Sequence, residues 1–373
     1  MAAALNLFRY DHFAQLPGPY RELSQPERAQ RMAAARERLG DSTLLLAHNY
    51  QHHEIYRLAD ATGDSFKLSR FAADTNADHI VFCGVTFMAE TADILTGGKR
   101  NVIIPSREAA CPMAGMAEMV QVERAWDQLT SIVPPEDLLP ITYMNSYADL
   151  KAFTGRHGGA ICTSSNARRV MRWALEQDKR VLFLPDEHLG RNTALDLGLT
   201  EEELAVWNPW ASSMGGLDAE RVRDARVVLW KGMCQVHARF TVGHVNAMRA
   251  EHPGVEILVH PECVHEVVKA ADRAGSTEEI IAWVKAAPAG ATLAIGTEVH
   301  LVEHLQLDHP DKTIIQLCGE ACLDCNAMRQ VDPNYLTWVL EELADGRVHN
   351  RVTVAEGDAG WARVALERML ELA

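Results

Sequence analysis

The chain has 373 residues, is 47% apolar and carries a formal net charge of −15. This length is ample for a buried core and predicts two or three domains. The negative charge argues against nonspecific binding to nucleic acid, and no apolar run reaches the roughly 18 residues that cross a membrane. The chain does not open with a charged segment followed by an apolar one, so we expect a cytoplasmic protein without a secretory signal.

The first 40 residues are predicted to form an N-terminal extension, in which an amphipathic surface helix covers 27–39 after Pro26. From Thr43 to about Leu317, short apolar strands alternate with helical stretches, a pattern typical of βαβ units with parallel sheets. We expect the final helix, Trp361–Leu372, to pack back on the first domain.

One pattern occurs three times along the chain. In each unit a strand ends on polar residues, a helix follows, and a hydroxyl residue opens a second helix. The distance from the polar residue to the hydroxyl residue is 17 positions from His48 to Ser65, 21 from Tyr143 to Ser164 and 17 from His260 to Thr277. Further strands follow, and then a cysteine: Cys111, Cys234 and the group Cys318, Cys322 and Cys325. Such self-similarity predicts copies of one unit around a threefold-like centre.

Each repeated strand ends on two polar side chains that are two residues apart. These pairs are His48 and Tyr50, Tyr143 and Asn145, and His260 and Glu262. In an extended chain this spacing puts both side chains on one face. Ligands of parallel α/β sheets bind beyond the carboxyl ends of the strands, so three such pairs should converge on one cavity. One pair alone would be ordinary strand-end polarity; its threefold repetition favours a site.

The hydroxyl residues Ser65, Ser164 and Thr277 each precede a helical run. One interpretation is an N-cap, in which the side chain binds the helix's own backbone N–H groups. The other is an anion site, because a helix N-terminus attracts phosphate and carboxylate groups. Three helix starts that face one cavity would suit a substrate with several anionic groups.

The cysteines fall into two sets. Cys83, Cys162 and Cys263 lie within or beside apolar runs, as small buried residues do. Cys111, Cys234 and the last group each follow a strand. Three thiolates from distant parts of the chain suit a [4Fe–4S] cluster better than a structural zinc ion, which takes four ligands from local pairs. Three ligands leave one iron open, and an open iron is a Lewis acid.

Ten ordered motifs resemble those of the quinolinate synthase family of NAD biosynthesis, and the resemblance runs from residue 44 to 328. The matching stretches are AHNYQ (47–51), GDS (63–65), FCGVTFMAET (82–91), CPMA (111–114), YMNS (143–146), CTSSNA (162–167), CQVH (234–237), HPEC (260–263), GST (275–277) and IGTE (295–298).

The resemblance implies an α/β fold of three αβα domains with small parallel sheets around a pseudo-threefold axis. The expected domains are 41–115 (completed by 326–373), 116–236 and 237–325. It implies a [4Fe–4S] cluster at the centre and the condensation of iminoaspartate with dihydroxyacetone phosphate to quinolinate, phosphate and two waters. This reaction belongs to de novo NAD biosynthesis. The expected partners are these two substrates and, as a further candidate, the enzyme that produces iminoaspartate.

The resemblance also implies roles for single residues. The cluster ligands are Cys111, Cys234 and Cys325. The catalytic residues are Tyr50, Tyr143, His260 and Glu262, and the substrate-binding residues are His48, Ser65, Asn145, Ser164, His237 and Thr277.

The third cluster ligand has an alternative in Cys322. The position just after the strand favours Cys322, whereas the Asn326-Ala327-Met328 segment matches the family and favours Cys325, which we choose. Cys318 and Cys322 are then spare thiols or, alternatively, a redox pair.

Two other functions use a similar cluster. A hydro-lyase of the aconitase type would act on a tricarboxylate, and an iron or oxygen sensor would need neither the polar pairs nor the hydroxyl-headed helices. The sequence shows no basic patch of the kind that a DNA-binding sensor carries.

Overall fold

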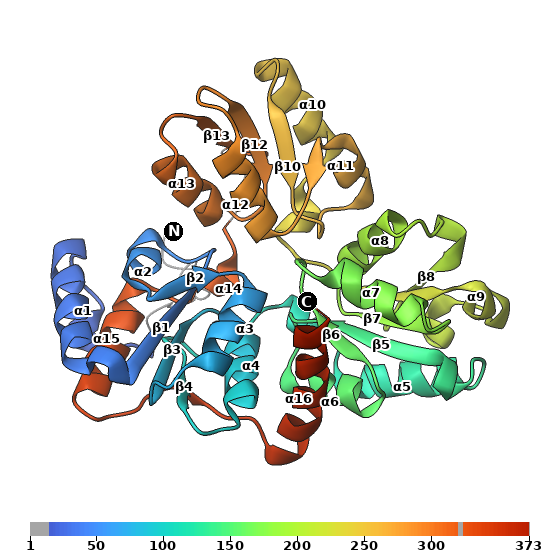
Figure 1. Cartoon of the computed structure of the whole chain (residues 1–373), viewed down its shortest axis with the longest axis horizontal. Helices are drawn as coiled ribbons and strands as arrows, with labels where there is room; N and C mark the ends of the chain where they lie inside the picture. Colours follow the sequence, from blue (N-terminus) through green and yellow to red (C-terminus); the bar gives the residue numbers. More distant parts are fainter. Residues whose placement is uncertain (1–14, 320–323, 373) are drawn as a thin grey trace, which may run out of the picture.

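The computed structural model describes residues 15–319 and 324–372. It contains three α/β units that surround a common centre (Figure 1). Cys322 lies outside the described residues.

The first unit has a five-stranded sheet in the order β14-β4-β3-β1-β2. Its strands are β1 (Thr43–His48), β2 (Ala61–Gly63), β3 (His79–Cys83), β4 (Asn101–Ile103) and β14 (Arg351–Val352), of which only β14 runs antiparallel to its neighbour. The helices between the strands are α2 (His53–Leu58), α3 (Ser65–Asp74) and α4 (Thr86–Thr96).

The second unit has a parallel sheet in the order β6-β5-β7-β9-β8. Its strands are β5 (Leu138–Tyr143), β6 (Ala160–Cys162), β7 (Arg180–Leu184), β8 (Leu204–Trp207) and β9 (Val227–Trp230). Its helices are α5 (Met119–Thr130), α6 (Ala148–Arg156), α7 (Ala167–Leu175), α8 (Glu187–Asp196) and α9 (Ala219–Asp224).

The third unit has a parallel sheet in the order β11-β10-β12-β13. Its strands are β10 (Glu256–Val259), β11 (Arg273–Ala274), β12 (Thr292–Gly296) and β13 (Thr313–Gln316). Its helices are α10 (Val242–Glu251), α11 (His265–Ala270), α12 (Thr277–Ala286) and α13 (Val299–Asp308).

The three sheets share one topology. In each unit the first strand lies between the second and the third, so that β1, β5 and β10 are equivalent, as are β3, β7 and β12. The next place in the sheet is taken by β4, β9 and β13, of which β9 comes after β8 in the chain. The predicted α/β fold with repeated small parallel sheets is confirmed. β8 and β14 extend two of the sheets beyond the repeat.

The N-terminal helix begins two residues earlier than predicted, as α1 (Gln25–Leu39), and packs against α15 (Pro333–Ala344). An ion pair of 2.6 Å joins Arg31 to Glu341 across this contact, and the Tyr20 hydroxyl also donates to Glu341. A short helix, α14 (Asn326–Arg329), leads from the centre of the molecule to α15.

The C-terminal helix α16 (Glu356–Glu371) packs differently from our expectation. It lies mainly against α6 and β6 of the second unit, and it also contacts α4 of the first (Figure 1). Gly155 of α6 makes this close approach possible, because a Cβ atom there would lie 1.9 Å from the Trp361 carbonyl oxygen. The sequence predicts the C-terminal helix but not the element against which it packs.

Apolar packing reflects this arrangement. One core cluster is continuous from Leu45 of β1 through Ile141 of β5 to Ala365 of α16, so it joins the first two units. The third unit has two clusters of its own, around Ile257 and Ile295.

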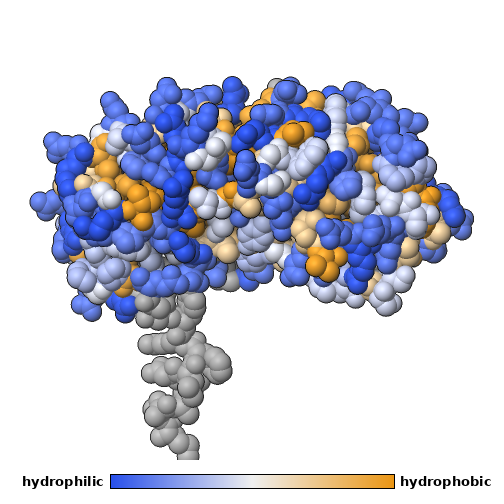
Figure 2. All heavy atoms as spheres, turned by 90° about the horizontal axis from the view of Figure 1, so that it is seen from below, coloured by the Kyte–Doolittle hydropathy of each residue, from blue (hydrophilic) through white to orange (hydrophobic). Residues whose placement is uncertain are grey.

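The face drawn in Figure 2 is mostly hydrophilic, and its apolar residues form separate patches. In the described parts of the chain, none of the helices combines the length and apolarity of a membrane span.

We predict that Gly155→Ala lowers the free energy of unfolding by roughly 1–3 kcal/mol, the usual cost of overpacking, because α6 and α16 must move apart. The control is Gly357→Ala in α16, where a Cβ would meet nothing within 4 Å. It should be neutral or stabilising, since alanine is the better helix former. Urea denaturation measures both; equal stability of the two variants would contradict the α6–α16 contact.

Candidate active site at the centre of the three units

Every residue predicted for the site lines one central cavity of about 70 Å³. The three polar pairs, the three hydroxyl residues, His237 and the three cysteines all contribute to its wall. The members are His48, Tyr50, Ser65, Cys111, Tyr143, Asn145, Ser164, Cys234, His237, His260, Glu262, Thr277 and Cys325.

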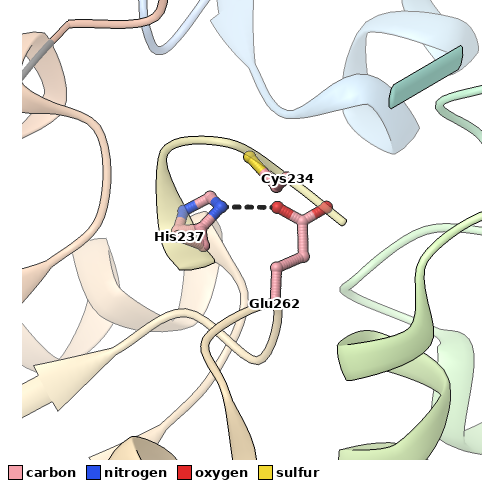
Figure 3. A group of neighbouring side chains, drawn as sticks. All are labelled: Cys234, His237 and Glu262. Carbon is pink, nitrogen blue, oxygen red and sulfur yellow. Dashed lines mark ion pairs between the residues drawn. The ribbon is translucent and has the colours of Figure 1, made fainter. Parts of the chain in front are cut away.

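A carboxylate lies at the middle of this cavity. Glu262 is only 2% exposed, and one of its oxygens is 2.6 Å from His237 Nδ1 and 3.5 Å from His260 Nδ1 (Figure 3). Burial alone would raise the pKa of Glu262, but the combined attraction of His237, His260 and the Tyr143 hydroxyl outweighs it and lowers the pKa to about 2. The other oxygen, Oε1, is buried without a hydrogen-bond partner among the described residues. It is therefore available to a ligand.

The histidines around Glu262 differ from ordinary surface histidines. The rings of His237 and His260 stack with centroids 4.3 Å apart. Burial lowers the pKa of His48 to about 3, and burial together with the neighbouring His237 lowers that of His260 to about 3. His48 and His260 are thus neutral near pH 7, and each can donate one hydrogen bond and accept another.

Two tyrosines face the same centre. The Tyr50 hydroxyl lies 2.8 Å from Thr297 Oγ1. Burial raises the pKa of both Tyr50 and Tyr143 well above the ordinary value, and for Tyr143 the nearby Glu262 carboxylate adds to this effect. Both phenols are therefore protonated and can donate to a substrate oxygen.

The N-cap interpretation is wrong for Ser65 and Thr277. The caps of α3 and α12 are the preceding residues, Asp64 and Ser276, whose side chains accept from the helix backbone. Ser65 and Thr277 are instead the first residues of these helices, and Thr277 Oγ1 is buried without a hydrogen-bond partner among the described residues.

The third hydroxyl residue, Ser164, precedes α7, whose N-cap is Asn166. The Asn166 side chain accepts from the Thr163 backbone N–H at 2.7 Å. None of the three hydroxyl residues is therefore used as the N-cap of its helix, so the anion-site interpretation is the one that the geometry favours.

The three cysteines predicted as ligands come together from the three units. Cys111, Cys234 and Cys325 are free thiols that line both the central cavity and a second cavity of about 290 Å³. Burial raises the pKa of Cys111 to about 11 and, together with Cys111 itself, that of Cys325 to about 12. The thiols are thus close enough to influence one another.

The remaining cysteines are not part of this group. Cys83, Cys162 and Cys263 are free and fully buried in apolar surroundings, as predicted. Cys318 is disulfide-bonded and so is not a spare thiol.

A metal ion could also be held by a smaller set of donors. Cys234 Sγ and one ligand atom each of His237 and Glu262 lie within 4.8 Å of one another (Figure 3). Thiolate, imidazole and carboxylate together are a common donor set for transition metals.

Comparison with known proteins identifies the family. The quinolinate synthetase A protein profile matches residues 30–371. The chain belongs to the quinolinate synthase family. The quinolinate synthase of Halobacterium salinarum is 55% identical over 368 residues, which cover 99% of this chain and 98% of that protein. The enzymes of Rhodopirellula baltica (49% identity, 94% of this chain and 92% of that protein) and Corynebacterium glutamicum (50%, 96% and 90%) are similar over nearly their full lengths.

The structure adds site residues that the quinolinate synthase resemblance did not supply. Thr297 Oγ1 lies 2.8 Å from the Tyr50 hydroxyl and 3.1 Å from His237 Nε2, so it connects two site residues. The rule that ligands bind beyond strand ends could have found Thr297, because it directly follows β12. Phe87, Met88 and Met328 form an apolar part of the wall; they lie within segments that match the family, but no site role was assigned to them.

The cap assignment predicts opposite effects of neighbouring substitutions at the start of α12. Ser276→Ala removes the cap and should cost about 1 kcal/mol of unfolding free energy. Thr277→Val keeps the shape and removes a buried hydroxyl that has no partner, so stability should stay equal or rise. Urea denaturation in the absence of substrate measures both. A larger loss for Thr277→Val than for Ser276→Ala would restore Thr277 as the structural residue.

Proposed function

We propose that this chain is a quinolinate synthase that condenses iminoaspartate with dihydroxyacetone phosphate, releasing phosphate and water, in de novo NAD biosynthesis. The observation that carries the proposal is the convergence of all the residues implied by the family on one cavity. Membership of the family supports the same reaction, since the relatives are named quinolinate synthases.

The proposed cofactor is a [4Fe–4S] cluster, and three features of the chain suit it. Cys111, Cys234 and Cys325 come from three separate units, they are free, and they border two cavities at once. Three thiols for four irons leave one iron without a protein ligand. Their raised pKa values mean that thiolates form here only with a strong cation nearby, which a cluster provides. When bound, the cluster supplies a Lewis acid for the loss of hydroxide.

Substrate anions would bind at the hydroxyl residues. Ser65 and Thr277 open helices α3 and α12, so their hydroxyls stand next to backbone N–H groups at the positive ends of helix dipoles. The unpartnered Thr277 hydroxyl can donate to a carboxylate or phosphate oxygen. Asn145 and neutral His48 add uncharged donors at the same cavity.

Proton transfer would centre on Glu262. It is ionised, its Oε1 atom has no hydrogen-bond partner among the described residues, and His237 Nδ1 stands 2.6 Å from its other oxygen. It can therefore accept a proton from a substrate carbon or nitrogen, while Tyr50 and Tyr143 keep their protons and can donate to oxygens that gain charge. Because Glu262 and Tyr143 are buried, each of these interactions is stronger than it would be in water.

Replacement of each proposed cluster ligand tests the cofactor. Cys111→Ser, Cys234→Ser and Cys325→Ser should abolish quinolinate formation and lose the iron, the inorganic sulfide and the brown colour after anaerobic reconstitution. Cys162→Ser is the matched control, because Cys162 is buried at a strand end and is not one of the residues that line the cavity. It should keep the iron, the sulfide and the colour.

Two outcomes would contradict the cluster. Iron without inorganic sulfide would favour a single ion held by Cys234, His237 and Glu262. A Cys325→Ser variant with a full cluster would remove that residue from the ligand set.

Glu262→Gln tests the proton acceptor. The amide keeps the shape but cannot take up the proton, so turnover should fall roughly 10²–10⁴-fold, the usual contribution of general acid–base catalysis. Iron and sulfide content should stay at the wild-type level. Glu256→Gln serves as the control and should keep its activity, because Glu256 begins β10, the strand that precedes Glu262, and pairs with Arg273 instead. Near-normal turnover of Glu262→Gln would limit Glu262 to a structural role.

A further inference from the structure

Two fully buried carboxylates begin helices at equivalent places in the second and third units. Asp186 caps α8 just after β7, and Glu298 caps α13 just after β12. Both side chains are 0% exposed. Because β7 and β12 occupy the same position in their sheets, the two carboxylates are counterparts in the repeat.

Each carboxylate holds two segments of its unit. Asp186 accepts from the Leu189 N–H of its own helix at 2.7 Å with Oδ1 and from the Cys234 N–H at 3.1 Å with Oδ2. Glu298 accepts from the His300 N–H at 2.8 Å with Oε2 and from the Cys325 N–H at 3.2 Å with Oε1. Its Oε1 atom also lies 2.9 Å from His300 Nδ1, so Glu298→Ser removes this contact as well and Asp186→Ser is the cleaner test. One oxygen thus caps the helix, and the other holds the backbone of the cysteine that lies beyond the fourth strand.

The first unit makes a related link without a charge. Thr86, the first residue of α4, donates its backbone N–H at 2.8 Å and its hydroxyl at 3.0 Å to the carbonyl of Ala109, two residues before Cys111. The cysteine segment of every unit is therefore held by the start of the helix that follows the third strand. Only in the second and third units is the cysteine N–H itself bound.

Helix capping alone does not account for buried carboxylates. Taking a carboxylate out of water costs several kcal/mol, whereas a cap contributes about 1 kcal/mol, and serine would supply the cap more cheaply. What aspartate and glutamate add over serine is a second oxygen that reaches the cysteine.

We propose that Asp186 and Glu298 are positioning residues that fix the backbones of Cys234 and Cys325 so that both thiolates meet the cluster. This inference rests on the proposed function, because it assumes that these cysteines hold iron. It assigns the two carboxylates a role in retaining the cofactor rather than in contact with substrate.

Asp186→Ser and Glu298→Ser test the inference, because serine keeps the helix cap and removes the second oxygen. In Asp186→Ser the backbone bond from Glu187 N–H to Gly232 remains, so the loop keeps its course and only the cysteine is released. The control is Asp218→Ser at the start of α9, because Asp218 accepts from the Arg221 N–H of its own helix at 2.8 Å and binds none of the described cysteines.

Two measurements compare these variants with the unmodified chain. The first is the rate at which a ferrous chelator removes iron from the reconstituted protein. The second is the rate at which iodoacetamide alkylates Cys234 and Cys325 in the apoprotein, followed by peptide mass spectrometry. The loss of a hydrogen bond to a charged group changes an equilibrium constant roughly tenfold or more. We therefore expect the rates of iron removal and of alkylation to rise about tenfold in the two test variants. Both rates should stay constant in Asp218→Ser.

The outcomes separate the two proposals. Wild-type rates in both test variants would overturn the positioning role. An unmodified chain that takes up no iron and sulfide would overturn the proposed cofactor, while alkylation of the apoprotein would still decide whether the carboxylates hold the cysteine segments. Should Asp186→Ser not fold, Asp186→Asn keeps the volume and one acceptor oxygen, and it should show the same faster alkylation of Cys234.

Discussion

The arrangement at the centre of this molecule depends on one buried negative charge, the carboxylate of Glu262. Glu262 is almost fully buried, and a buried carboxylate is tolerated only where neighbouring groups compensate it. His237 supplies the closest compensation, and the protonated phenols of Tyr50 and Tyr143 face the same charge. These groups come from different units, so the three units must meet before the charge is satisfied. The site is therefore complete only when the three units are docked on one another.

The repeated topology explains how so many polar groups reach one place. The carboxyl ends of parallel strands all face the same side of a sheet, and three equivalent sheets turn that side toward one centre. The strand-end pairs, the helix starts and the segments that carry the cysteines are then three sets of equivalent positions in the repeat. The residue type differs between equivalent positions: threonine, aspartate and glutamate bind the cysteine-containing segments of the three units.

Local patterns explain what could be predicted. The strand ends at His48, Tyr143 and His260 follow from short apolar runs, and strand-end geometry then places all of them at one cavity. The sequence does not identify the N-caps, because Asp64 and Ser65 are adjacent residues that can both cap a helix, as are Ser276 and Thr277. Only the backbone conformation selects one residue of each pair. Long-range contacts carry no such local signal. Nothing near Trp361 in the sequence indicates that α16 packs on α6, nor does the sequence around Glu298 point to Cys325.

The continuous apolar core that joins the first two units has a consequence for how the chain unfolds. Buried apolar surface makes unfolding cooperative, so these two units and α16 should melt as one block, while the third unit has separate cores. The third unit meets this block through hydrogen bonds and ion pairs, among them those from Asn49 to Glu278 and from Arg57 to Asp308. Because Glu262 belongs to one block and Tyr143 to the other, mild denaturant should separate the halves of the catalytic cavity while both remain folded.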